Sequence, residues 1–127
     1  MTLKDITFKQ SKEFEFLNPI TKESYSPKVF IEILNSESKE AKNNLLKAQR
    51  KIFELMQDED NKEDGKLKSD LIENVNKIYL SSLIIGWKNI DDFKKVTDEA
   101  KIKLIENEYI LAFVMECTSS LGNFKAD

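Results

Sequence analysis

The stretch LIIGWKNIDDF, residues 83–93, holds the chain's only tryptophan and decides how the second half of the chain is organised. Its apolar start continues a helical pattern that begins at Asp70, where apolar residues recur at spacings of three and four. The adjacent Asp91 and Asp92 favour a turn, because their side chains readily bond to nearby backbone groups. We therefore expect a largely apolar helix that ends at Trp87 and is followed by a turn.

Trp87 has two interpretations. It can anchor the core at the end of this second helix, as large aromatic residues usually do, or it can be an exposed contact for a partner. Gly86 beside it weakens a helix and lets another backbone or ring approach closely. We predict that Trp87 is mostly buried and acts as a structural anchor.

Two more helices are predicted after the turn. Thr97 is a favourable N-cap for the third helix, whose first turn is acidic, as the helix dipole favours. Asn107 is expected to cap a final helix that carries the apolar run YILAFVM, residues 109–115, and ends near Gly122 in the left-handed position. The inner face of the third helix is predicted to consist of Ala100, Leu104 and Ile105.

The first half begins with a predicted β-hairpin over residues 13–34. Phe14 and Phe16 alternate with acids, and an alternating apolar pattern returns from Val29 onward, as is typical of half-buried strands. The connection NPITKESYSP, residues 18–27, holds both prolines and therefore indicates a turn outside any central strand.

An amphipathic first helix over residues 35–56 follows, with Asn35 and Ser36 as its expected caps. The acidic segment 57–70 has a single apolar residue, so we expect a mobile loop there. Helical structure resumes over residues 71–124. The predicted fold is therefore a single, mainly α domain of about four helices with an N-terminal β-hairpin, an α+β arrangement.

The acidic segment has part of the spacing of a calcium-binding loop. Counted from Asp60, acids occupy positions one and five, the latter being Asp64, and Gly65 occupies position six. Position three is Lys62 and position twelve is Leu71, so one oxygen ligand and the closing bidentate carboxylate are missing. We predict a solvated linker and no metal site.

The composition argues against catalysis and against several classes of partner. The 127 residues hold no histidine and one cysteine, which removes the commonest general base and any zinc cluster of Cys and His. The three glycines are isolated, so no phosphate-binding loop is predicted. A net charge of -3 gives no broad attraction for nucleic acid or anionic membranes. We predict no catalytic residue, no cofactor, no nucleic-acid or membrane partner, and a buried packing role for Cys117.

Taken in order, these segments resemble the tail assembly chaperones of long-tailed bacteriophages and their prophages. The likeness covers residues 13–124: a strand, a turn such as NPITKE, a second strand, and a polar cap like NSES before a long helix. In the second half it consists of IIGWKNIDD, VTDEAKIKLIENEYI and LGNF. The turn DFKKV, residues 92–96, departs from the family pattern because it lacks the Gly and Pro common in relatives.

The resemblance implies a non-enzymatic protein of the host cytoplasm that keeps the phage tape measure protein soluble until tail-tube subunits polymerise around it. Such a protein is not expected in the mature virion. Relatives are often made as a shorter and a frameshift-extended form, and this chain is similar to the shorter kind, so the extended form is a candidate partner. The alternative is a structural head-tail joining or tail-completion subunit that stays in the virion.

The final helix is the expected partner surface. In the run YILAFVM, the side chains of Tyr109, Ile110, Phe113 and Val114 cannot all face one small core if the helix lies on the surface. An apolar side would then remain for the client or for a second copy of the chain, because exposed apolar patches mark either kind of interface. We predict these four residues as partner-binding and keep a homo-oligomer as the alternative use.

Overall fold

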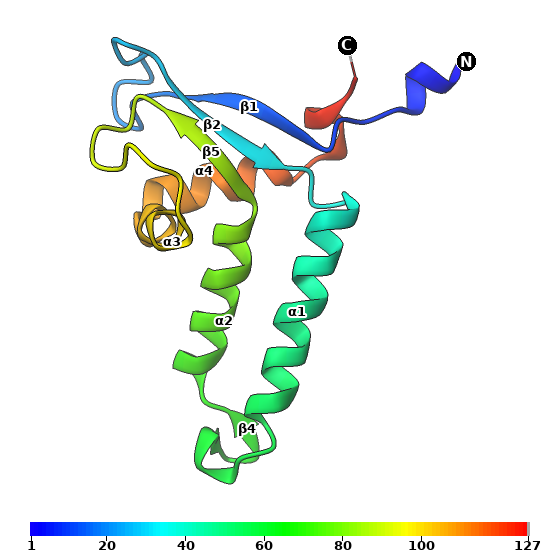
Figure 1. The fold of residues 1–127 in the computed structure, drawn as a ribbon, viewed down its shortest axis with the longest axis vertical. Helices are drawn as coiled ribbons and strands as arrows, with labels where there is room; N and C mark the ends of the chain where they lie inside the picture. The colour runs from blue at the N-terminus through cyan, green and yellow to red at the C-terminus, as the bar shows by residue number, and fades with distance from the viewer. Residues whose placement is uncertain (127) are drawn as a thin grey trace.

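The structure, a computed structural model, describes residues 1–126 as a body with a long arm (Figure 1). The body holds a three-stranded antiparallel sheet and two short helices, and the arm consists of two helices that run side by side away from it. The class is α+β, with four α-helices among the described residues, as predicted, and more sheet than the predicted hairpin. No helix in this part of the chain combines the length and apolar character that crossing a membrane requires.

The predicted N-terminal hairpin is confirmed. Strand β1 (Ser11–Phe16) pairs antiparallel with β2 (Val29–Leu34), and the register runs from Ser11 opposite Leu34 to Phe16 opposite Val29. Phe14 and Ile31 are directly opposite each other in this pairing, so their side chains lie on the same face of the sheet. That face turns toward the core.

The prediction that the second helix extends to Trp87 is wrong. Helix α2 (Ser69–Ser82) ends earlier, and β5 (Ile84–Lys88) adds a third strand to the free edge of β2. A short apolar run fits a buried helix and a buried strand equally well, and the β-branched and aromatic residues of IIGWK favour the strand. As the central strand, β2 buries Ile31 and Ile33 completely.

Trp87 therefore lies in a strand opposite Ile31, on the core side of the sheet. The indole is half-buried and packs against the core, and its Nε1–H donates a hydrogen bond of 2.6 Å to the carbonyl oxygen of Phe93. This bond ties β5 to the loop that follows it, where Asp91 and Asp92 form the predicted turn.

Helix α1 (Lys39–Leu55) begins later than predicted. Its N-cap is Ser38, whose Oγ accepts a hydrogen bond of 3.1 Å from the backbone N–H of Ala41. Asn35, the expected cap, instead accepts a hydrogen bond from the N–H of Glu37 with its side chain and is buried at the end of β2. Asn35, Ser36 and Ser38 are all favourable cap residues, so the sequence alone does not show which of them begins the helix.

The acidic segment predicted to be an irregular loop has regular structure at the far end of the arm. A 3-10 turn (Glu59–Asn61) leads into the two-stranded ribbon of β3 (Lys62–Glu63) and β4 (Lys66–Leu67). Asp64 and Gly65 form the connection with φ values of 53° and 76°, which is the geometry that Asp-Gly favours in a two-residue hairpin. Leu67, the single apolar residue, is 6% exposed.

The caps of the last two helices are as predicted. Thr97 caps α3 (Asp98–Glu106), and the side-chain oxygen of Asn107 accepts hydrogen bonds from the N–H groups of Tyr109 and Ile110 at the start of α4 (Glu108–Thr118). Gly122 is not in a left-handed position, because it lies within a 3-10 turn (Leu121–Phe124). The predicted inner face of α3 is confirmed, since Ala100, Leu104 and Ile105 are all buried.

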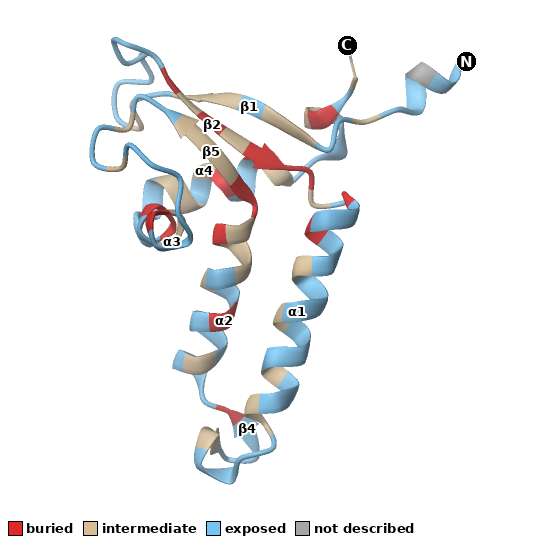
Figure 2. Ribbon diagram, in the orientation of Figure 1, coloured by how far each residue is buried: buried red, intermediate tan, exposed pale blue. Residues whose placement is uncertain are grey.

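The core lies in the body, where α4 crosses behind the sheet (Figures 1 and 2). Its fully buried side chains come mainly from β2, β5, α3 and α4, and Phe124 closes it from the C-terminal turn. The arm contributes little, because Ala41 is the buried residue of α1 and most of that helix is exposed (Figure 2).

Candidate binding groove

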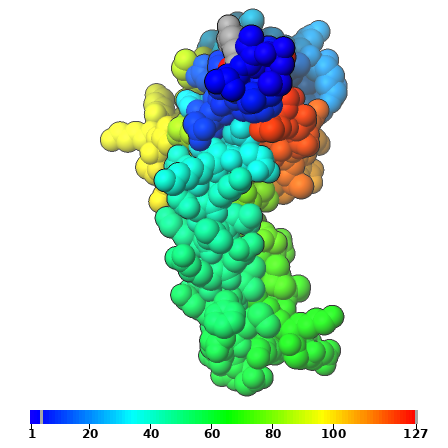
Figure 3. Space-filling model, turned by 90° about the vertical axis from the view of Figure 1, so that its right-hand side faces the viewer, coloured from blue at the N-terminus to red at the C-terminus, as the bar shows by residue number. Residues whose placement is uncertain are grey.

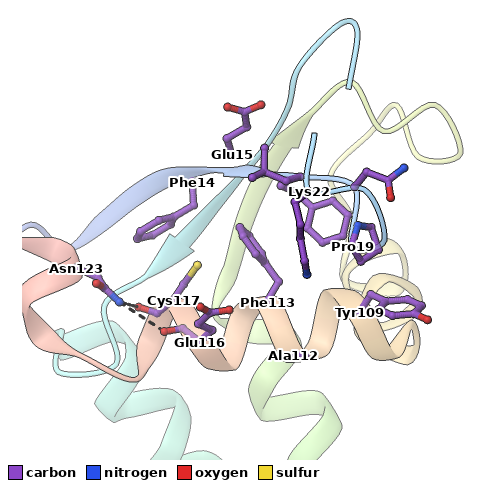
Figure 4. Close-up of a pocket in the computed structure, with 13 residues that line it drawn as sticks. Phe14, Glu15, Pro19, Lys22, Tyr109, Ala112, Phe113, Glu116, Cys117 and Asn123 are labelled. Carbon is purple, nitrogen blue, oxygen red and sulfur yellow. Dashed lines mark hydrogen bonds between the residues drawn. The ribbon is translucent and has the colours of Figure 1, made fainter. Parts of the chain in front are cut away.

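A groove of about 580 Å³ lies between the end of β1, the loop after it and α4 (Figure 4). Its volume is in the range of pockets that hold small ligands or a few side chains of a partner. The residues that line it are Phe14, Glu15, Phe16, Leu17, Asn18, Pro19, Lys22, Tyr109, Ala112, Phe113, Glu116, Cys117 and Asn123.

Strand β1 supplies the aromatic floor of the groove. Phe14 and Phe16 are two residues apart in an extended strand, so both rings point to the side where α4 lies. The ring of Phe16 meets that of Phe113 edge to face at 5.1 Å, and the ring of Phe14 meets that of Phe124 in the same way at 5.4 Å. These contacts hold the floor in one arrangement, because edge-to-face pairs have a preferred geometry.

The NPITKE turn supplies one wall of the groove. The side chain of Asn18 accepts hydrogen bonds from the N–H groups of Ile20 and Thr21, and its backbone carbonyl accepts one of 2.8 Å from Lys22. Lys22 has a left-handed φ of 65°, so the chain reverses sharply there. The turn thereby places Pro19 and Lys22 along one side of the groove (Figure 4).

Helix α4 supplies the other wall with Tyr109, Ala112, Phe113 and Glu116. The last three lie three, four and seven residues after Tyr109, so all four share one face of the helix. Two of the four predicted partner-binding residues, Tyr109 and Phe113, are among them. Tyr109 is 50% exposed at the end of the groove, whereas Phe113 is half-buried against Phe16.

The other two predicted residues face the body. Ile110 is half-buried and packs against the core, and Val114 is completely buried, so Val114 is not available to a partner. An apolar run in the sequence does not show which side of the helix the sheet will cover. In the structure the sheet covers the side that carries Val114. The groove residues that the prediction missed are mainly Phe16, Pro19, Lys22 and Ala112. Helical spacing from Tyr109 indicates Ala112, but nothing local places the NPITKE turn beside α4.

The base of the groove holds the only thiol. Burial, and to a lesser extent the negative charge of Glu116, raise the pKa of Cys117 from 9.0 to about 12. The thiol is therefore protonated at neutral pH and is a poor nucleophile. Asn123 fixes the end of α4 beside it by donating a hydrogen bond of 3.0 Å to the Cys117 carbonyl oxygen (Figure 4).

Charged groups surround the apolar floor and do not converge on a point inside it. Lys22 and Glu116 lie on different walls, and Glu15 points away from the groove on the other side of β1 (Figure 4). Among residues 1–126 there is no group of three His, Cys, Asp or Glu side chains that could hold a metal ion. The groove has an apolar floor and a charged rim, which suits an apolar side chain or the apolar face of a helix.

Comparison of the chain with protein-family models, with curated proteins and with solved structures finds no match.

Proposed function

We propose that the chain is a non-catalytic tail assembly chaperone, which binds apolar helical segments of the phage tape measure protein and keeps that protein soluble during assembly. The observation that carries the proposal is the groove between β1, the NPITKE turn and α4, with Phe14 and Phe16 as its floor and Phe113 on its helical wall. A rigid apolar floor with a charged rim is how proteins receive the apolar face of an amphipathic helix.

The geometry of the groove fits this use better than it fits chemistry. Its thiol has a raised pKa, and its charged side chains lie on the rim rather than beside one another. General acid–base work needs a titratable group poised near neutral pH and within reach of the reacting atom. A binding role needs only apolar area that the client can cover.

The resemblance to tail assembly chaperones supplies the identity of the client. Two of the segments that carry the resemblance form the groove: the NPITKE turn is one wall, and the start of α4, in ENEYI, holds Tyr109 on another. The proposal includes a site of action in the host cytoplasm, absence from the mature virion, and a frameshift-extended form of the chain as a further partner.

Co-expression with the tape measure protein tests the proposal. The client is the product of a long, helix-rich reading frame, which we expect beside the gene for this chain. We expect it to be soluble with the wild-type chain and to precipitate with Tyr109→Glu, which puts a charge at the half-exposed end of the groove. The matched control is Met115→Glu, because Met115 is 53% exposed on the same helix and does not line the groove.

Two results would contradict this function. If Tyr109→Glu folds and still keeps the tape measure protein soluble, the groove is not the client site. If mass spectrometry finds the chain in purified virions in stoichiometric amounts, the alternative of a head-tail joining or tail-completion subunit replaces the chaperone.

A further inference from the structure

Strand β1 lies at the edge of the sheet and has one unpaired side of its backbone. The carbonyl oxygen of Gln10 accepts a hydrogen bond from the N–H of Asn35, so the even-numbered residues of β1 direct their N–H and C=O groups toward β2. The backbone groups of Ser11, Glu13 and Glu15 therefore point away from β2, and no partner for them lies among the described residues. Such a row of donors and acceptors is a template for another strand.

The chain itself adds a short strand to this edge just before β1. The N–H of Lys9 donates a hydrogen bond of 2.6 Å to the carbonyl oxygen of Phe124. Phe8 pairs antiparallel with Lys125, and the space-filling view shows N-terminal and C-terminal residues packed against each other at this end of the body (Figure 3). These C-terminal residues reach the edge before β1, and none of them pairs with β1 itself.

The open edge of β1 runs beside the groove. Glu15 lines the groove although its side chain points away from it, so the backbone of Glu15 forms part of the margin (Figure 4). Phe14 and Phe16 project to the groove side, and α4 lies opposite with Tyr109 and Ala112. A strand added here bonds to the edge through its backbone and places every second side chain between β1 and α4. Proteins bind extended peptides at a sheet edge in this way.

The other face of β1 is acidic. Glu13 and Glu15 lie on it, whereas Lys12 lies on the core side, with its Nζ 5.8 Å from the centre of the Phe14 ring. Glu13 forms an exposed ion pair of 3.1 Å with Lys88 of β5. The Oε2 atom of Glu15 is shielded from water and has no hydrogen-bond partner among the described residues. A cation placed beside such a carboxylate stabilises it.

We propose that the edge of β1 binds an extended segment of a partner protein in which apolar and basic residues alternate. The apolar residues lie opposite Phe14 and Phe16 and enter the groove. The basic residues lie opposite Glu13 and Glu15, because directly opposed residues of two strands share a face. The ligand thus becomes a fourth strand of the sheet, held by backbone hydrogen bonds and selected by its alternating side chains.

The same charges argue against a second copy of the chain as the ligand. Antiparallel pairing of two β1 strands about a two-fold axis keeps the faces of the sheet, so it brings Glu13 and Glu15 of one copy close to the same two residues of the other. Like charges opposite each other destabilise a strand pair. The two acids therefore protect the edge against self-association and select a basic ligand.

This inference goes beyond the proposed function, because it concerns an extended ligand at the backbone edge and needs no tape measure protein. The apolar residues of that ligand use the same floor as a client helix, so the two ligands exclude each other. The two ideas fail separately: a peptide that does not bind overturns this inference alone, whereas a folded Tyr109→Glu chain that keeps the client soluble overturns the proposed function alone.

A labelled peptide tests the inference on the full chain. The probe is a capped, fluorescent Thr-Val-Lys-Val-Lys-Val-Thr, in which valine and lysine alternate. We expect a saturable rise in fluorescence anisotropy with the wild-type chain. Replacing the lysines of the peptide by glutamate should weaken binding by about tenfold or more, because acids then face Glu13 and Glu15. In the complex the backbone N–H groups of Ser11, Glu13 and Glu15 should exchange with deuterium more slowly.

Methylation of the peptide's backbone nitrogens tests for strand pairing. In a strand, successive N–H groups point to opposite edges, so either those of the lysines or those of the valines bond to β1. One of the two methylated peptides should therefore lose binding while the other keeps it. An equal effect of the two methylations would show that the backbone edge is not used.

A charge reversal in the chain tests the outer face. Glu15→Lys should weaken binding of the lysine peptide by about tenfold or more and strengthen binding of the glutamate peptide, since the opposed pair is then attractive again. Glu54→Lys is the matched control, because it makes the same charge change at an exposed residue of α1 and should leave both affinities unchanged. Circular dichroism checks that each variant is folded. A lysine peptide that does not bind the wild-type chain, or that binds the Glu15→Lys chain equally well, overturns the proposal.

Discussion

The indole N–H of Trp87 donates a hydrogen bond of 2.6 Å to the carbonyl oxygen of Phe93, and this contact joins the third strand to the loop that leads into α3. The ring itself packs on the core face of the sheet, opposite Ile31. Trp87 thus has two separable roles: it fills space under the sheet, and it fixes the path of the chain after β5.

Two substitutions separate these roles. Trp87→Phe keeps most of the ring and removes the donor, so we expect a loss of about 1 kcal/mol in the free energy of unfolding. Trp87→Ala removes the ring as well, and because the residue is half-buried we expect about 3 kcal/mol, the lower end of the range for core aromatics. Urea unfolding followed by circular dichroism measures both. Equal stability of Trp87→Phe and the wild type would show that the hydrogen bond contributes nothing.

The features that the sequence predicted well are those set by neighbours in the chain. Thr97 and Asn107 cap helices because an acceptor side chain can reach backbone N–H groups two or three residues ahead. Strand β5 was missed because IIGWK becomes a strand only when β2 lies beside it, and β2 is some fifty residues earlier. Val114 was misassigned for a similar reason, since only the packed body shows which side of α4 the sheet covers.

Asn107 should be a stabilising cap that can be tested on its own. Its side chain accepts hydrogen bonds of 3.0 and 3.2 Å from the first N–H groups of α4, so Asn107→Ala should cost about 1 kcal/mol. Asn107→Asp keeps the acceptor and adds a negative charge at the positive end of the helix, so it should be close to neutral. Thermal unfolding of the two variants gives the comparison, and an alanine variant as stable as the aspartate variant would contradict the capping role.

Cys117 should react slowly in the folded chain. A pKa raised from 9.0 to about 12 lowers the thiolate fraction at pH 8 by roughly a thousandfold, since each pH unit is a factor of ten. Burial restricts access further. Ellman's reagent should therefore label the native chain far more slowly than the urea-unfolded chain. Rapid labelling of the native chain at pH 8 would mean that the groove exposes the thiol.

The same shift makes a prediction about stability at high pH. Well below pH 9 the thiol is protonated in both states and contributes no pH dependence. Between pH 9 and about 12 the unfolded chain loses the proton first, so the free energy of unfolding falls as pH rises. Tyr79, whose pKa is raised above 10.0 by burial and then by Glu37, acts in the same direction. Cys117→Ala should reduce the slope over this window, and an unchanged slope would contradict the shift.

The acidic tip should not bind calcium specifically. Its acids lie on a 3-10 turn and a two-stranded ribbon, and the sequence lacks the ligand at Lys62 and the closing carboxylate at Leu71. Titration calorimetry should show no uptake at micromolar calcium, and the melting temperature should not change. Micromolar binding would show that the tip rearranges around the ion.

Tyr109 and Phe113 should separate binding from stability in the groove. Phe113 is half-buried with its ring edge to face on Phe16, so Phe113→Ala should cost about 2–3 kcal/mol in the free energy of unfolding, below the full range for a buried Phe.

Tyr109 is 50% exposed at the end of the groove, and Tyr109→Ala should change stability by no more than about 0.5 kcal/mol, as is usual at exposed positions. If the groove is the client site, the stable Tyr109→Ala variant should still hold less tape measure protein in solution than the wild type does, because it loses the contact area of the aromatic side chain. Urea unfolding gives the stabilities, and the soluble fraction of the co-expressed client gives the binding. A Tyr109→Ala chain with wild-type stability and wild-type retention of the client would show that the exposed end of the groove takes no part in binding.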